Sequence, residues 1–104
     1  MRFKIIITTT NNYNIAKKIA KYLIDSKISA CVQIVPNINS IFKWENNIVE
    51  EKEILLIIKT DNKNITKCNK IIKQLHNYEC PEIISIDSEI LNKKYKNWFL
   101  DVLG

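Results

Sequence analysis

The segment Glu53–Lys59, with the sequence EILLIIK, is apolar at five consecutive positions. Successive side chains of a strand point to opposite faces, so Ile54, Leu56 and Ile58 share one face and Leu55 and Ile57 the other. A sheet with one solvated face would instead alternate apolar and polar residues. The segment therefore predicts a strand in a sheet that must be covered on both sides.

The other elements follow from apolar periodicity and from turn residues. Strands are expected over Phe3–Thr9, Ser29–Val35 with its continuation Ile38–Trp44, Ile48–Thr60 and Pro81–Ile86; helices are expected behind Asn11–Asn14, over Ile65–Leu75 and over Asn92 to about Val102. The chain has a single glycine, at its last position. Asn46-Asn47 are expected to form the turn between the two long strands, because Asn tolerates a positive φ better than other non-glycine residues.

This order predicts one α+β domain over residues 1–104, a βαββαβ sandwich followed by a C-terminal helix. Right-handed crossovers place the first and third strands in the centre of the sheet. Pro36 and Pro81 then fall in the second and fourth strands, which are the edges, where proline is tolerated. The expected architecture is ferredoxin-like.

The hairpin of the second and third strands is too long for the body of such a domain. Each strand would extend ~40–50 Å at about 3.3 Å per residue, whereas a globule of this size has a radius of gyration of about 13 Å. Its tip carries Ile41, Phe42 and Trp44. We expect a long protruding hairpin whose tip, with Leu55 and Ile57 of the sheet, contacts a neighbouring copy. The alternative is a hairpin that bends at Pro36 and folds back on its own domain.

The net charge of +5 invites a nucleic-acid partner, but the sequence is crowded with Ile, Asn and Lys, as AT-rich coding would produce. We therefore interpret the charge mainly as background and expect no nucleic-acid partner. Three cysteines without a CxxC motif indicate reduced thiols. The first apolar run is too short for a signal peptide, and no run approaches a membrane span. A soluble, cytoplasmic protein is expected.

His76 is the single histidine, so any metal or acid–base chemistry near neutral pH depends on it. Glu79, Cys80 and Glu82 follow closely, and Cys31 joins them only if the fold or a neighbouring copy brings it near. An imidazole, a carboxylate and a thiolate suit Cu²⁺ or Zn²⁺. The alternative is that His76 caps the second helix, where a cation suits the dipole.

Lys59 ends an apolar strand and is expected to face a ligand cleft between subunits, together with Tyr78 and Glu82. Trp44 and Trp98 are expected to be packing anchors of an interface. A nucleophile–base–orienter set is not visible, so catalysis is not expected.

Four segments resemble, in order and at the right spacing, the CutA family of divalent-cation tolerance proteins: Ala30–Pro36 (ACVQIVP), Ser40–Trp44 (SIFKW), Glu53–Thr60 (EILLIIKT) and His76–Ile84 (HNYECPEII). Tyr95 and Trp98 resemble the C-terminal end of that family. The resemblance implies a homotrimer of ferredoxin-like subunits, similar in architecture to the PII signalling proteins. It also implies a link to copper and other divalent cations, with no settled enzymatic activity.

The expected function is thus a non-enzymatic, signalling-type module with no obligatory cofactor that binds Cu²⁺ or another divalent cation weakly, or a small anion. The chain departs from the family where Asn37 and Asn46 replace Gly and where Asn77 replaces Pro, a change expected to loosen the entry to the last strand. Two alternatives share the strand order. An RNA-binding domain would need aromatic rings in place of the Leu and Ile residues of Glu53–Lys59, and a small ferredoxin-fold enzyme such as an acylphosphatase would need an arginine-bearing phosphate loop.

Overall fold

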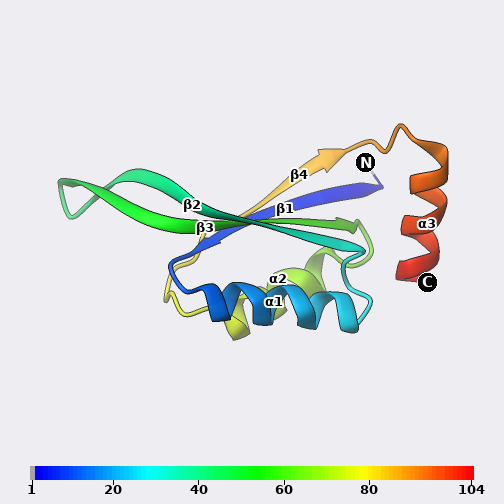
Figure 1. Ribbon diagram of the computed structural model, residues 1–104, viewed down its shortest axis with the longest axis horizontal. Coiled ribbons are helices and arrows are strands. Elements are labelled where there is room, and N and C mark those ends of the chain that lie inside the picture. Colours follow the sequence, from blue (N-terminus) through cyan, green and yellow to red (C-terminus); the bar gives the residue numbers. More distant parts are fainter. Residues whose placement is uncertain (1) are drawn as a thin grey trace.

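The computed structural model describes residues 2–104 (Figure 1). The elements are β1 (Phe3–Thr10), α1 (Tyr13–Asp25), β2 (Cys31–Trp44), β3 (Asn47–Asp61), α2 (Ile65–Leu75), β4 (Ile83–Ser88) and α3 (Lys93–Leu103). This order confirms the predicted βαββαβ arrangement with a C-terminal helix.

The four strands form one antiparallel sheet in the order β2-β3-β1-β4. The first and third strands are central, as predicted. Pro36 lies in the edge strand β2, whereas Pro81 precedes the edge strand β4 and does not open it. Both prolines thus avoid the central ladders, where their missing N–H would cost a hydrogen bond.

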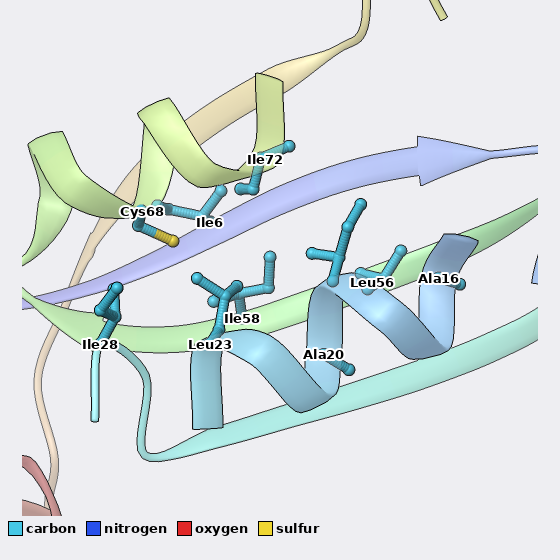
Figure 2. Close-up of a cluster of buried hydrophobic side chains, with 10 residues drawn as sticks. Ile6, Ala16, Ala20, Leu23, Ile28, Leu56, Ile58, Cys68 and Ile72 are labelled. Atoms are coloured by element: carbon cyan, nitrogen blue, oxygen red, sulfur yellow. The ribbon is translucent and has the colours of Figure 1, made fainter. Parts of the chain in front are cut away.

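Helices α1 and α2 cover one face of the sheet and bury the main core against it (Figures 1 and 2). The buried side chains of this core are Ile6, Ala16, Ile19, Ala20, Leu23, Ile28, Leu56, Ile58, Cys68 and Ile72. They recur at helical spacing in α1 and α2 and at alternate positions in β1 and β3. The side chain of Asn12 caps α1 by accepting a hydrogen bond from the Ile15 N–H at 3.0 Å.

Helix α3 lies across one end of the sheet and forms a second, smaller core there (Figure 1). Phe99 packs edge-on against Phe3, with ring centroids 5.5 Å apart, and Ala30 completes the buried set. Among residues 2–104, no helix combines the length and apolarity that crossing a membrane requires.

Strands β2 and β3 continue past the end of β1 as a paired extension, residues 38–53, which we call the arm. Its pairing runs from Ile38 opposite Glu53 to Trp44 opposite Asn47, and the arm gives the molecule a long axis of 46 Å (Figure 1). Trp44 is 59% exposed near its tip. The prediction of a protruding hairpin is confirmed, and the alternative of a hairpin folded back on its own domain is wrong.

Two irregularities shape this hairpin. A bulge between Val35 and Ile38 places Pro36 and Asn37 opposite one residue of β3, and Asn37 has φ 60°. The tip turn consists of Glu45 and Asn46, with φ 48° and 67°, so the predicted Asn46-Asn47 turn is wrong by one residue. Positive φ at both central residues is typical of the type I′ turn, whose twist matches that of the strands.

The sheet surface opposite α1 and α2 is apolar along the middle of the central strands β1 and β3, with the exposed Gln33 of β2 beside Ile57. We call this surface the open face; its apolar members are Ile5, Ile7, Val35, Leu55, Ile57, Ile84 and Ile86. Ile84 and Ile86 are 50% and 43% exposed, and Leu55 and Ile57 are half-buried. The predicted pattern, apolar side chains on both sides of the central strands, is thus confirmed.

Candidate functional site

A groove of about 940 Å³ lies at the base of the arm, beside the loop that enters β4. Its lining comes from the end of β1 (Thr9), from the arm (Ser40, Ile41, Phe42, Trp44, Val49, Glu51 and Glu53) and from the loop (Tyr78, Glu79, Cys80 and Glu82). Thr9, Glu51 and Glu53 lie on the same side of the sheet as Leu55, so the groove continues the open face.

The groove is acidic. Four carboxylates line it, from Glu51, Glu53, Glu79 and Glu82, and its lining contains no basic side chain. Glu53 is 8% exposed and has no cation within salt-bridge distance, since the one ion pair in the described chain joins Lys4 to Asp87. Buried carboxylates without a cation are costly, so the groove is electrostatically suited to a positively charged occupant.

Tyr78 joins the loop to the arm through Glu53. Its hydroxyl donates to Oε2 of Glu53 at 2.6 Å, a short bond of the kind expected for a charged acceptor. Burial, then the hydrogen bond and the negative charge of Glu53, raise the pKa of Tyr78 above its ordinary value. The phenol therefore stays protonated and serves as a donor.

Both ring nitrogens of His76 are engaged in hydrogen bonds. The Tyr78 N–H donates to Nδ1 at 2.9 Å, so Nδ1 must be the unprotonated nitrogen. Nε2, 2.8 Å from the carbonyl oxygen of Thr9, then carries the proton and donates it. His76 is also the C-cap residue of α2, its own N–H bonded to the carbonyl of Ile72. In this conformation, neither nitrogen has a free lone pair for a metal ion.

Asn77 does not loosen the loop, contrary to the expectation from sequence. Its Oδ1 accepts a hydrogen bond from the Thr10 hydroxyl at 2.6 Å, and its amide donates to Asn11 at 2.8 Å. Together with the bond from His76 to Thr9, these bonds tie the loop to the end of β1.

The three predicted metal ligands do not converge within one chain. Cys31 pairs with Lys59, which faces Ile5, whereas His76 reaches β1 at Thr9. These two points on β1 are four residues, about 13 Å, apart. Residues 2–104 contain no cluster of three His, Cys, Asp or Glu side chains that could hold a metal. A metal site completed by a second copy stays a prediction.

Within one chain, the residues of the ligand cleft predicted between subunits line two separate cavities. Tyr78 and Glu82 both line the acidic groove. Lys59 instead lines a smaller cavity of about 290 Å³ beneath α3, with its Nζ 5.9 Å from the ring centroid of Tyr95.

The predicted interface residues lie on three surfaces. Ile41, Phe42 and Trp44 are exposed on the arm, Leu55 and Ile57 belong to the open face, and Trp98 is exposed on α3, where it stacks at a tilt on Tyr95. The arm and the open face are continuous through the groove.

Sequence reasoning missed Glu51 and Glu53 as members of the site. The signal was present, because these two carboxylates occupy alternate positions directly before the apolar run of β3 and therefore share a face with Leu55 and Ile57.

Comparison with known proteins gives consistent results. The family model described as CutA1 divalent ion tolerance protein matches residues 4–102. The divalent-cation tolerance protein CutA of Thermus thermophilus is 34% identical over 101 residues, which cover 97% of this chain and 98% of that protein. Human protein CutA is 33% identical over 94 residues, which cover 90% of this chain and 52% of the longer human protein.

Solved structures agree. The crystal structure of divalent ion tolerance protein CutA1 from Ehrlichia chaffeensis superposes with a TM-score of 0.92 at 33% identity, covering 99% of this chain and 96% of that one. CutA1 from Oryza sativa gives a TM-score of 0.92 at 32% identity, covering 98% and 94%. Because the match extends over nearly the whole chain in sequence and in structure, the chain belongs to the CutA1 family of divalent ion tolerance proteins.

Proposed function

We propose that this protein is a homotrimer that acts in the tolerance of divalent cations, copper among them, by binding a metal ion or small ligand between subunits. It works as a cytoplasmic, signalling-type module and not as a catalyst. Membership of the divalent ion tolerance family supports the general role.

The open face is the observation that carries the proposed assembly. Seven apolar side chains gather on one sheet surface, and the exposed Phe42 and Trp44 extend this surface along the arm. A contiguous apolar surface of this kind usually marks a contact with another chain. The arm projects beyond its own domain and is therefore placed to reach a neighbouring copy, whose open face it would help to cover.

The acidic groove supports a divalent cation as the ligand. Carboxylates are ligands for many divalent cations, and four of them line one groove together with the thiol of Cys80. The groove opens on the surface that the proposed assembly covers, so a second copy can supply the remaining ligands. The engagement of both His76 nitrogens supports a binding role over acid–base catalysis.

Native mass spectrometry and calorimetric titration with Cu²⁺ and Zn²⁺ test this proposal. The double variant Glu79→Gln/Glu82→Gln removes two groove carboxylates, and Glu45→Gln/Glu50→Gln removes two exposed ones from the arm outside the groove. We expect a trimer in every case and a fall in metal affinity of about 10-fold or more in the groove variant alone.

His76→Ala tests the loop separately. It breaks two hydrogen bonds that fix Tyr78 and Thr9 relative to each other, so metal affinity should fall although His76 is not itself a ligand in this conformation. Equal metal affinity in the wild type and in both the groove and His76 variants would contradict the ligand site. A monomer would contradict the assembly.

A further inference from the structure

The positive charge of this protein is concentrated on one layer of the fold. Residues 13–27 and 61–76, which contain α1 and α2, hold eight lysines and two aspartates, a net charge of +6. The remaining residues together carry −1 of the total +5. The net positive charge, which composition alone suggests is coding background, is therefore localised on the helices.

All eight of these lysines are exposed: Lys17, Lys18, Lys21, Lys27, Lys63, Lys67, Lys70 and Lys73. Of the two aspartates, Asp61 is buried and its carboxylate accepts hydrogen bonds from the backbone and side chain of Asn64. Asp25 is the one exposed carboxylate on this surface. The solvent therefore meets seven more positive than negative side chains here.

These lysines are not neutralised within the chain. Across residues 2–104 the one ion pair within 4 Å is Lys4–Asp87, between β1 and β4, and it involves none of these eight lysines. The acidic residues gather instead on the arm and in the groove. The molecule thus has a basic helix layer and an acidic arm base, and its field attracts polyanions to the helices.

Helical periodicity explains why the lysines share one surface. The apolar stripe of α1, including Ala16 and Leu23, and that of α2, including Cys68 and Ile72, face the sheet (Figure 2). Positions between these stripes must point outward. Because α1 and α2 pack side by side, their outer surfaces join into one basic layer.

Exposed tyrosines interrupt this layer. Tyr13 and Tyr22, at the two ends of α1, are 52% and 48% exposed. Lys17 Nζ lies 5.8 Å from the ring centroid of Tyr13. Tyr22, Lys18 and Lys21 line a shallow hollow together with Asp25 and apolar side chains. Aromatic rings among cations are suited to stacking with bases beside a phosphate backbone.

We propose that this helix layer binds the phosphodiester backbone of nucleic acid without sequence specificity. A nucleic acid fits better than a lipid surface, because the apolar stripes of both helices are committed to the core and cannot insert. The layer lies opposite the open face, so it stays outside when copies cover that face. The expectation that the chain has no nucleic-acid partner rests on the net charge alone and not on where the lysines lie.

Fluorescence anisotropy of the full chain with a labelled DNA duplex and with a single-stranded RNA, each of mixed sequence, tests this directly. We expect both probes to bind, with an affinity that falls steeply between about 50 and 200 mM salt. Lys67→Gln/Lys70→Gln on α2 should weaken binding about 10-fold at low salt and reduce the salt slope by about two.

Lys93→Gln/Lys94→Gln is the matched control, because it removes the same charge from exposed positions on α3. It should leave binding within about twofold of the wild type. Circular dichroism and sedimentation confirm that both pairs keep fold and assembly. An equal loss in the two pairs would show that only net charge matters and would overturn the proposal. Failure to bind either probe at low salt, or binding to phosphatidylserine vesicles without binding to nucleic acid, would also overturn it.

Discussion

Thr8 and Thr10 are a pair of buried hydroxyls on the same side of β1 with opposite hydrogen-bonding states. Both side chains are fully buried. Thr10 donates to Asn77, whereas Thr8 Oγ1 is the one buried side-chain polar atom in residues 2–104 that lacks a partner. Leaving a hydroxyl unpaired in the core costs free energy, while a methyl group of the same shape does not.

Thr8→Val should therefore raise the free energy of unfolding by about 1 kcal/mol, and Thr10→Val should lower it by a similar amount because Asn77 loses its donor. Urea denaturation of the two variants measures the contrast. A loss of stability in both variants would show that Thr8 has a partner in solution.

The bond between Tyr78 and Glu53 holds the groove in shape. Tyr78→Phe would leave the carboxylate of Glu53, which is 8% exposed, without its donor. The expected cost is about 1.5–3 kcal/mol, the range for hydrogen bonds to charged groups. Tyr22→Phe, at an exposed ring on α1, is the control and should change the free energy of unfolding little. Similar values for both variants would contradict the structural role of Tyr78.

Burial of the Cys68 thiol makes the free energy of unfolding fall at alkaline pH. Burial raises the pKa of its thiol from 9.0 to about 12, so the folded chain holds the proton that the unfolded chain releases. This contribution is fully present below pH 9.0 and is lost as pH rises toward about 12, by up to ~1.4 kcal/mol per pH unit. The raised pKa of Tyr78 acts in the same direction.

Cys68→Ala should start from a lower free energy of unfolding but lose less of it between pH 8 and pH 11 than the wild type, about 2 kcal/mol less. Urea titrations at both values provide the measurement. Parallel pH profiles for the two proteins would mean that the Cys68 thiol is accessible to solvent.

At the scale of elements, the end of α1 is a site of backbone strain. Lys27 adopts φ 60° just after the helix, while its N–H and that of Ile28 bond the carbonyls of Ile24 and Leu23 at 3.1 and 3.0 Å. Glycine normally occupies this position because it carries no Cβ.

Lys27→Gly should raise the free energy of unfolding by about 1 kcal/mol, whereas Lys27→Ala, which removes the same charge but keeps a Cβ, should not. Thermal melts of both variants distinguish backbone strain from charge. Equal shifts would assign the effect to the charge of Lys27.

The elements themselves were largely predictable, because apolar periodicity and Asn caps set their type. The hairpin turn was placed one residue late, since two adjacent asparagines tolerate positive φ better than Glu45 does. The cross-strand register, Trp44 opposite Asn47, decides the turn instead. The turn propensities of single residues do not determine this register, because it depends on packing along the whole hairpin.

At the scale of the molecule, sequence predicted the doubly apolar sheet but not the acidic groove. Alternation within one strand is a local property, so Leu55 and Ile57 could be assigned to an uncovered face. The groove joins Glu53 to Tyr78, 25 residues apart, and depends on a bulge at Pro36–Asn37 and on a loop pinned by Asn77. Within one chain the fold places Cys31 and His76 at opposite ends of β1, so their predicted grouping depends on a neighbouring copy.

The open face, which neither α1 nor α2 covers and which continues into the arm with its exposed Phe42 and Trp44, is the feature on which the proposed assembly depends. Ile57→Glu places a charge at its centre, and Thr66→Glu places the same charge on the exposed surface of α2.

Sedimentation equilibrium at about 10 µM is the most direct measurement of this assembly. The wild type and Thr66→Glu should sediment with three times the monomer mass, and Ile57→Glu should dissociate. A folded wild-type monomer at that concentration would contradict the burial of the open face between copies.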